Sequence, residues 1–381
     1  MKKVGVLTFT VPHRDPRVAR QIQFLQAAGH QVVVFGRKGA QPPPAQSGVR
    51  YFLTPLTKTW GLRIRKAVLL PARRFETFFW QQPWVQAMWA QREHLQGADV
   101  LITNDVETLP LAAALAETTG AKLVLDAHEY APGQFEDRPL WRLTILPFAR
   151  YLCRQYLPKV DLMFTVSPGV AAAYQATYGV QPRLLYNTPP YHPLTPILRP
   201  HNAPIKLVHH GAAIPSRRLE LTIQAMQRLG PQFQLDFYLV PTNKRYLQKL
   251  RRLARTTPHI RFRQPVPLEQ IVPTLHQYDV GVFLLPPTNF NYHHALPNKF
   301  FEFIQARLAV AIGPSPDMQD IVAQENCGVV ATDFTAQAFA TALANLTHAQ
   351  INTFKQQSHR IAQIYTAEAQ YQKLLDWLER L

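Results

Sequence analysis

Apolar runs alternate with amphipathic segments along almost the whole chain. Residues 2–10 form a run rich in β-branched side chains, typical of a buried strand. Residues 15–29 have helical periodicity, with Asp15 suited to cap the helix and Gly29 suited to end it. Residues 30–36 form the next apolar strand. A strand, a helix and a second strand in this order predict a crossover unit with parallel strands.

The same alternation continues to the C-terminal part of the chain and is interrupted once. The prolines that begin after Thr188 make a helix or strand improbable there, and we place a linker at residues 191–204. The further predicted strands are residues 98–104, 121–127, 160–167 and 182–187 before the linker, and 205–211, 233–240, 259–264 and 279–286 after it.

This pattern predicts an α/β protein with two Rossmann-like domains. The chain has 381 residues, which is long for a single core. We expect an N-terminal domain over 1–190 and a C-terminal domain over 205–364. Ligands of such sheets bind outside the carboxyl ends of the strands, so a cleft between the domains is the expected site.

The net positive charge of the chain indicates which classes of binding partner suit it. Lys and Arg number 41 against 24 Asp and Glu, a net charge of +17. Nucleic acid, an anionic membrane surface or a phosphate-rich substrate would each suit this excess, and so would a generally basic proteome. Two cysteines offer neither a disulfide framework nor metal spacing, and no apolar run is long enough to cross a bilayer. We therefore expect a cytoplasmic protein.

The turn after the first strand of the second domain has features of a phosphate site. Gly211 follows the strand directly, and Arg217 and Arg218 stand at a helix start. A glycine allows close approach of a ligand, while helix amides and arginines suit phosphate oxygens. A turn glycine with two solvated arginines is the alternative. The corresponding turn of the first domain contains no glycine, which argues against a dehydrogenase.

The segment Leu296–Gly313, LPNKFFEFIQARLAVAIG, carries a lone carboxylate among aromatic residues. We predict that Asn298 caps a short helix and that Glu302 lies in its first turn. A carboxylate can accept hydrogen bonds from two vicinal hydroxyls, such as those of a ribose. The alternative is an acid placed there to suit the helix dipole.

These segments together resemble retaining GT-B glycosyltransferases, family 4 in particular. The resemblance rests on Leu296–Gly313 with the MQDIV and CGVV that follow it, on RRLELTIQA, and on DPRVARQIQFLQAAGHQVVV, DAHEY, TVSPGVAAAYQATYGV and YNTPP in the expected order. The last residues, about 365–381, resemble the family's C-terminal helix that crosses back to the first domain. The resemblance implies a GT-B architecture, with two domains facing across a cleft.

For the donor, the resemblance implies that Glu302 holds the nucleotide ribose. The family's other glutamate is expected eight residues earlier, where this chain has His294. Arg217 matches a phosphate-binding position, and Lys299 is our candidate to replace an arginine that is absent beside the glycine. Gly211, Asn298 and Phe300 complete the predicted donor site.

For the acceptor, the resemblance implies that His128 of DAHEY faces the sugar. A histidine satisfied by its neighbours at a strand end is the alternative. Asp105 and Glu107 stand at another strand end, where they could orient an acceptor hydroxyl or cap a helix. We take His128, Arg217 and Lys299 as the candidate catalytic residues.

The implied reaction needs neither a metal nor a bound cofactor. A UDP- or GDP-linked sugar would be the donor, and positive groups would stabilise the leaving diphosphate. The acceptor would be a saccharide or a lipid-linked acceptor in the synthesis of a cell-surface polysaccharide or glycolipid. The lone acid would then bind the sugar nucleotide and transfer no proton.

Residues 58–90 combine basic and aromatic side chains. Lys58, Arg63, Arg65, Lys66, Arg73 and Arg74 precede the first acid, and Trp60, Phe75, Phe78, Phe79, Trp80, Trp84 and Trp89 accompany them. Such segments suit anionic lipid headgroups, so we predict peripheral binding at the inner face of the cell membrane. The alternative is that the aromatic residues belong to the core.

Three other functions remain open from the sequence. A nucleotide-sugar 2-epimerase shares the fold. A catalytically silent relative that binds nucleotide or carbohydrate would be consistent with His294. A nucleic-acid binder is the weakest alternative, because no known nucleic-acid module accompanies the arginines and aromatics, and we expect no nucleic-acid partner.

Overall fold

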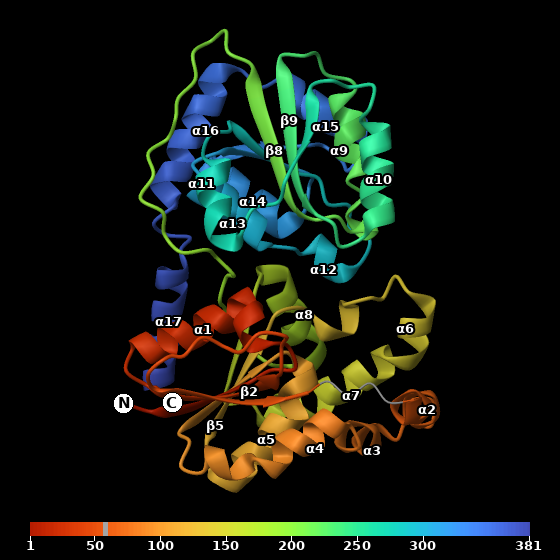
Figure 1. The fold of residues 1–381 in the computed structure, drawn as a ribbon, viewed down its shortest axis with the longest axis vertical. Helices are drawn as coiled ribbons and strands as arrows, with labels where there is room; N and C mark the ends of the chain where they lie inside the picture. Colours follow the sequence, from red (N-terminus) through yellow and green to blue (C-terminus); the bar gives the residue numbers. More distant parts are fainter. Residues whose placement is uncertain (56–59) are drawn as a thin grey trace. The chain divides into compact units, whose positions relative to one another are not determined.

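The computed structural model describes residues 1–55 and 60–381, except the side chains of residues 62 and 63. The chain forms two compact units (Figure 1). The N-terminal unit comprises 1–185, 289–291 and 371–381, and the C-terminal unit comprises 186–288 and 292–370.

The N-terminal unit is built on a parallel sheet with the strand order β3-β2-β1-β4-β5-β6-β7 among the described residues. Its strands are β1 (Lys3–Leu7), β2 (Gln31–Arg37), β3 (Val49–Thr54), β4 (Val100–Asn104), β5 (Lys122–Ala127), β6 (Leu162–Thr165) and β7 (Arg183–Leu184). Its helices are α1 (Pro16–Ala27), α2 (Trp60–Leu69), α3 (Phe75–Trp80), α4 (Pro83–Ala90), α5 (Leu109–Thr119), α6 (Pro139–Thr144), α7 (Leu146–Tyr156) and α8 (Pro168–Tyr178). Helix α1 lies on one side of this sheet, and α4 and α5 lie on the other (Figure 1).

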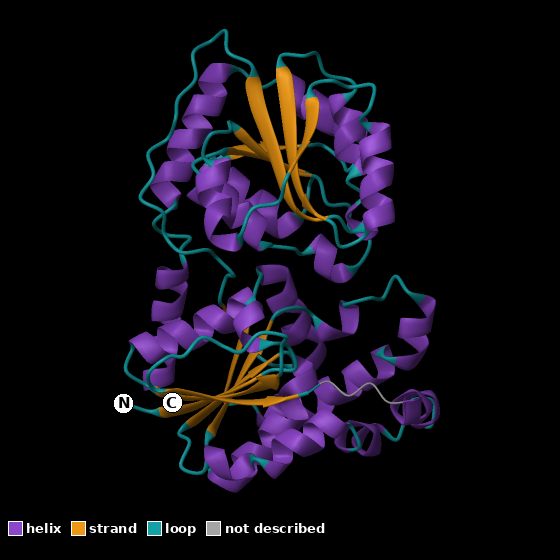
Figure 2. Cartoon of the chain, in the orientation of Figure 1, coloured by secondary structure: helices purple, strands orange, loops and turns teal. Residues whose placement is uncertain are grey.

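The C-terminal unit repeats this architecture with the order β10-β9-β8-β11-β12-β13, again parallel throughout the described chain. Its strands are β8 (Ile205–Ala212), β9 (Phe233–Val240), β10 (Ile260–Arg263), β11 (Val280–Phe283), β12 (Ala309–Ile312) and β13 (Gly328–Val330). Its helices are α9 (Glu220–Met226), α10 (Lys244–Leu253), α11 (Ile271–Leu275), α13 (Asn298–Gln305), α14 (Pro316–Glu325), α15 (Ala336–Ala344) and α16 (His348–Ile361), and the short α12 (Phe290–His293) spans residues of both units. Figure 2 shows the strands of each unit flanked by helices. The predicted α/β class with two Rossmann-like sheets is confirmed.

Local sequence accounts for the start of α1. The carboxylate of Asp15 accepts hydrogen bonds from the amides of Arg17 and Val18. Pro16 occupies the first helical position, where its missing N–H costs nothing. Gly29 follows the helix with φ +81°, a conformation that glycine adopts without strain. The predicted boundaries of this helix are therefore confirmed.

The proline-rich segment contains no helix or strand from residue 185 to 204, and it packs within the C-terminal unit. Arg307, whose side chain is fully buried, donates hydrogen bonds to the carbonyls of His192 and Leu194. The side chain of Gln305 accepts a hydrogen bond from the amide of His192. These contacts hold the segment in place, so it differs from a freely flexible linker.

The last helix, α17 (Ala367–Glu379), returns to the N-terminal unit from Tyr371 onward. The ring of Tyr371 stacks on Phe24 with centroids 4.6 Å apart, and its hydroxyl donates to the carbonyl of Arg17. Trp377 stacks on Phe164. The predicted return of the C-terminal helix is confirmed.

Candidate active site

Three residues predicted to bind phosphate meet at the carboxyl end of β8. Gly211 has φ +117°, and a Cβ atom placed on it would lie 3.3 Å from Nζ of Lys299 and 3.5 Å from a guanidinium nitrogen of Arg217. Arg217 comes from the short 3-10 turn Pro215–Arg217, and Lys299 comes from the first turn of α13. A glycine with two cations beside it leaves room for an anionic ligand close to the backbone.

Lys299 is a buried lysine without a carboxylate at salt-bridge distance among the described residues. Its Nζ lies 4.3 Å from the centroid of the Phe283 ring and donates to Nε2 of His209 over 3.2 Å. Nδ1 of His209 in turn donates to the carbonyl of Val282, which fixes the tautomer. Burial and the charge of Arg217 hold the pKa of Lys299 well below its ordinary value, although Glu302 opposes them. An anionic ligand beside Nζ would stabilise the charged form of Lys299, which burial disfavours.

Glu302 is buried in the same helix, one turn beyond Lys299. It is the fifth residue of α13, so it lies in the second turn, and the predicted first-turn position is wrong. The helix-dipole alternative loses its basis, because the dipole acts within the first turn. Oε2 of Glu302 lies 3.2 Å from Nε2 of His210, whose pKa is held well below its usual value by burial and by Lys299 and Arg217. A buried carboxylate beside a neutral histidine can accept hydrogen bonds from ligand hydroxyls.

Two residues predicted to bind the sugar-nucleotide donor do not have the positions that the prediction requires. Asn298 does not cap α13, because Pro297 is the N-cap residue with extended φ −77° and ψ 155°, and Asn298 is already helical. Phe300 is fully buried in the core, and its amide donates to the carbonyl of Pro297. Neither its side chain nor its amide is available to a ligand. Helical spacing explains the error, since Phe300 faces away from the side of α13 that carries Lys299 and Glu302.

His294, which stands where the resemblance expects a glutamate, follows α12 directly. Its Nδ1 lies 2.7 Å from Oδ2 of Asp317, a buried residue in the first turn of α14. The histidine is 20% exposed, so it is oriented by Asp317 and still reaches the surface. Asp317 was not predicted, although an acid at the start of the helix that follows an apolar strand was a visible signal.

The predicted acceptor residues meet in the N-terminal unit. The amide of His128 donates to Oδ1 of Asp105, and its Nδ1 lies 3.5 Å from Oδ2 of the same residue. Its Nε2 donates to Oδ1 of Asn104. Asp105 has φ +68°, a strained conformation for a residue with a Cβ, and such strain is often found at functional sites.

A buried ion pair lies next to the ring of His128. Arg17 and Asp126 form two hydrogen bonds, and the carboxylate of Asp126 also lies 3.7 Å from Nε2 of His128. Burial disfavours a charged histidine, but Asp105 and Asp126 outweigh it and raise the pKa of His128 to about 9. The charged form of His128 is therefore favoured at neutral pH, and its ring contacts with Asn104 and Asp105 agree with the alternative of a histidine satisfied by its neighbours. Arg17 and Asp126 were missed, although both lie inside motifs that carried the resemblance.

A cavity of about 390 Å³ lies in the N-terminal unit next to Asp105. Glu107 stands at its wall, and its side chain is exposed. The guanidinium of Arg37 lies over the ring of Trp84, 5.3 Å from its centroid, and both side chains line the cavity. The remaining wall consists largely of aromatic and small polar residues: Phe9, Thr10, Phe78, Phe79, Gln82, Asn104, Thr108, Ile145 and Phe148.

Most aromatic residues of the segment 58–90 belong to the core. This agrees with the alternative to membrane binding that the sequence left open. Phe75, Phe78 and Phe79 are buried, and Trp80, Trp84 and Trp89 pack against the same core. Trp60 differs, with 76% of its surface exposed. Of the predicted cations, Lys58 and the side chain of Arg63 lie outside the described residues, whereas Arg65, Lys66, Arg73 and Arg74 are exposed.

Two further features concern ligands and membranes. In the described chain, no three histidine, cysteine or acidic side chains come together in a way that could hold a metal ion. Within the same residues, no helix has the length and apolar character needed to span a bilayer.

Comparison with known proteins defines the class. Over its full length the chain superimposes on sucrose-phosphate synthase of Thermosynechococcus elongatus with a TM-score of 0.75 at 18% identity, covering 99% of that protein. An E. coli structure described as trehalose-6-phosphate bound with UDP-2-fluoro glucose gives 0.70 at 11% identity, with 100% and 99% coverage. HepE of Anabaena in complex with UDP and glucose gives 0.69 at 14%, with 100% coverage of both chains. At these identities the likeness shows the GT-B fold.

Family models then identify the chain. Residues 17–188 match the model described as Glycosyltransferase Family 4, and residues 204–349 match the model described as Glycosyl transferases group 1. Since the two models together match most of the sequence, the chain belongs to the family 4-like glycosyltransferases. No protein of curated function matches it by sequence.

Proposed function

We propose that the protein is a retaining glycosyltransferase that moves a sugar from a nucleotide diphosphate to a saccharide or lipid-linked acceptor. One observation carries the proposal: Gly211, Arg217 and Lys299 meet at the carboxyl end of β8, and Glu302 lies beside His210 of the same strand. Solved structures of the same fold hold UDP with glucose and UDP-2-fluoro glucose, which supports a nucleotide-sugar donor here.

In this proposal the donor's phosphates lie against Gly211, Arg217 and Lys299, and its ribose hydroxyls donate to Glu302. As the acceptor oxygen bonds to the anomeric carbon, the bond from that carbon to the diphosphate breaks. The acceptor proton passes to the leaving phosphate oxygen. Arg217 and Lys299 stabilise the charge that develops there, so the chain needs neither a metal nor a bound cofactor. His294, oriented by Asp317, would contact the donor sugar.

The acceptor would occupy the cavity beside Asp105 and Glu107. Aromatic walls suit the apolar face of a sugar ring, and carboxylates suit its hydroxyls. The cationic His128 would donate a hydrogen bond to a sugar oxygen. A polysaccharide or glycolipid of the cell surface is the product that we propose.

Thermal unfolding in the presence of nucleotides tests the donor site. We expect one of UDP, GDP, ADP, CMP or TDP, or their sugars, to raise the unfolding temperature of the wild type, because a ligand of the folded state stabilises it. Glu302→Ala should lose this effect while Glu269→Ala, an exposed acid of the same unit, keeps it. If no nucleotide stabilises the wild type, the donor-site proposal fails.

Product analysis separates transfer from epimerisation. A transferase releases nucleoside diphosphate only when an acceptor is present, whereas an epimerase converts the donor without one. A chain that binds nucleotide and does neither would be the silent relative.

We also propose that α2 binds the cytoplasmic face of an anionic membrane. Trp60, Ile64 and Val68 are 76%, 45% and 58% exposed and follow one another at four-residue intervals. This spacing places them on one face of the helix, and Arg65 and Lys66 stand beside them. An exposed apolar stripe with cations suits an anionic bilayer interface. Leu140 and Leu143 of α6 are likewise exposed, at 74% and 75%.

Vesicle sedimentation tests this membrane contact. We expect wild-type protein to bind vesicles that contain phosphatidylserine and to bind pure phosphatidylcholine far less. Trp60→Ser with Val68→Ser should reduce binding to the anionic vesicles. The matched control is Leu268→Ser, an exposed apolar residue of the C-terminal unit. Equal binding by all three proteins would contradict the proposal.

A further inference from the structure

One face of the second sheet is polar along β9 and β10, whereas buried apolar residues cover the same face at the later part of β8 and at β12. Strands buried on both faces read as nearly continuous apolar runs. Strands β9 and β10 alternate instead, with Phe233, Leu235, Phe237, Ile260 and Phe262 on the core side. The opposite side carries Gln234, Asp236 and Tyr238 from β9 and Arg261 and Arg263 from β10.

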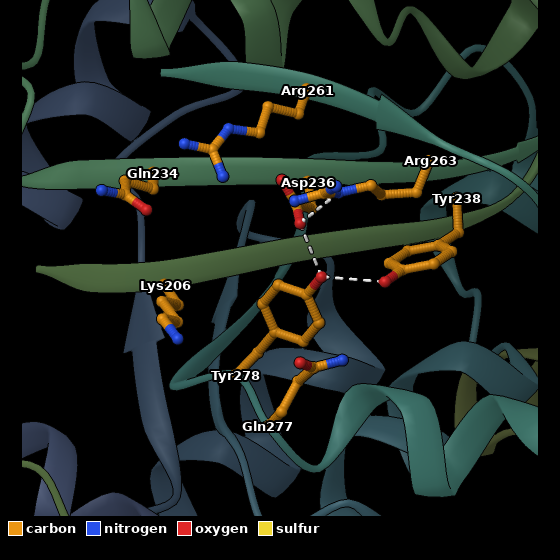
Figure 3. A pocket seen from close by; sticks show the side chains of 8 residues that line it. All are labelled: Lys206, Gln234, Asp236, Tyr238, Arg261, Arg263, Gln277 and Tyr278. Carbon is orange, nitrogen blue, oxygen red and sulfur yellow. Dashed lines mark hydrogen bonds and ion pairs between the residues drawn. The ribbon is translucent and has the colours of Figure 1, made fainter.

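The strand register brings these polar residues into one group. Lys206 pairs with Gln234 across β8 and β9, Asp236 pairs with Arg261, and Tyr238 pairs with Arg263. Together with Gln277 and Tyr278 they line a pocket of about 340 Å³ (Figure 3).

The single carboxylate of this pocket is already compensated. Oδ2 of Asp236 accepts from Nε of Arg263 over 2.8 Å and from the hydroxyl of Tyr278 over 2.7 Å. The Tyr278 and Tyr238 hydroxyls are 2.9 Å apart. Figure 3 shows this chain of interactions along one side of the pocket.

Two cations of the pocket lack such compensation. Neither the Lys206 ammonium nor the Arg261 guanidinium has an acidic partner within the described chain, and the two stand on strands that flank β9. Two uncompensated cations, with amides and hydroxyls around them, present the donors that a phosphate group requires. Lys206 is the second residue of β8 and Gly211 is the seventh, so this pocket lies about 16 Å along the strand from the donor phosphates.

We propose that this pocket, the β8–β10 pocket, is a second anion site that binds a phosphate-bearing ligand through Lys206 and Arg261. Its volume admits a small phosphorylated molecule or a lipid headgroup. Both ligands carry a phosphate group, and the same two cations would bind it. The proposal does not depend on the function of the donor site.

Isothermal titration calorimetry with pyrophosphate and with glucose 6-phosphate tests the site. The titrations use full-length protein carrying Arg217→Gln, which removes an arginine of the donor site and leaves the β8–β10 pocket intact. We expect saturable binding, weakened at least about tenfold by adding Lys206→Gln and Arg261→Gln. The matched control adds Lys244→Gln and Arg255→Gln, which remove two exposed cations of the same unit outside the pocket, and should keep its affinity.

Vesicles containing phosphatidic acid distinguish the two sources of phosphate. Vesicle capture that depends on Lys206 and Arg261 and is competed by pyrophosphate assigns the pocket to a lipid headgroup. Binding of the soluble probes without such capture assigns it to a free metabolite. The proposal is overturned if neither probe nor vesicle binds in a manner that depends on Lys206 and Arg261. Equal losses in the control variant would overturn it too, since general surface charge would then explain the binding.

Discussion

The lowered pKa of Lys299 predicts that ligand binding is coupled to proton uptake. Burial and Arg217 lower its pKa, while a bound diphosphate would raise it again. We predict that binding of the nucleotide diphosphate takes up protons at pH values between these two pKa values. The measurement is calorimetry in buffers with different ionisation enthalpies. Lys299→Met should bind more weakly and lose the proton uptake, whereas unchanged uptake in this variant would disprove the role.

The pKa of His128 is raised, unlike that of Lys299, and this makes the free energy of unfolding depend on pH. Its pKa is raised from 6.5 to about 9, so its stabilising effect is complete below pH 6.5 and disappears as the pH rises through 9. We predict that His128→Gln lowers the free energy of unfolding by roughly 1–3 kcal/mol at pH 6. The deficit should shrink steadily toward pH 9.

Urea denaturation at pH 6, 7.5 and 9 measures this deficit. His201→Gln, a change at an exposed histidine, serves as the control and should cost little at any of these pH values. A deficit that stays constant or grows toward pH 9 would show that His128 is not a stabilised cation.

At the scale of single residues, the sequence predicted several side chains that meet at the proposed donor site but not which way each would face. Gly211 and Arg217 were predicted from their chemistry and their place in the turn, Lys299 was chosen through the family resemblance, and the three do meet. Asn298 does not cap because α13 begins one residue earlier than predicted, and Phe300 faces the core because each residue of a helix is turned by about 100° from the one before it.

At the scale of single elements, the cap of α1 connects local sequence to the acceptor residues. Asp15 holds the first turn of α1, and that turn carries Arg17, which binds Asp126 beneath His128. We predict that Asp15→Ala costs about 1 kcal/mol of unfolding free energy, a typical N-cap loss. Chemical denaturation measures it, with Gln23→Ala on the exposed face of the same helix as control. No loss beyond the control would contradict a capping role.

Strands with a strong apolar run were predictable, and weaker ones were not. Strand β3 contains Arg50 and Tyr51 and was missed, because an edge strand needs fewer apolar residues than a central one. Helices α3 and α4 were misread for the opposite reason. Their tryptophans and phenylalanines looked like membrane anchors, since aromatic residues suit a lipid interface and a protein core alike.

At the scale of the whole molecule, the returning helix ties the C-terminus to the N-terminal unit. Leu374 of α17 is fully buried. We predict that Leu374→Ala destabilises the N-terminal unit by about 2–5 kcal/mol through the cavity it leaves. Hydrogen exchange should report faster opening in the strands of this unit and unchanged protection in the C-terminal unit. Lys373→Ala, at the exposed neighbour, should leave both unchanged, and a uniform change in both units would contradict the assignment.

The net charge of +17 is distributed over several surfaces. Between Asp236 and Glu269 the chain has eight Lys and Arg and no acid, and these cations lie on α10 and β10 or between them. Residues 58–90 were predicted to bind a partner through their cations, whereas this second concentration of cations was not predicted to bind anything. The β8–β10 pocket draws its arginines from it.

The sequence by itself determined the class of fold and the parallel pairing, and it supplied the candidate residues for a phosphate and a ribose. Those follow from apolar periodicity and from side-chain chemistry, which are local properties. Only the tertiary structure decided which residues face one another. It placed Asp317 beside His294, Arg17 and Asp126 beneath His128, and Arg37 over Trp84. Contacts between residues far apart in the chain depend on how strands pair and helices pack, and no local pattern specifies them.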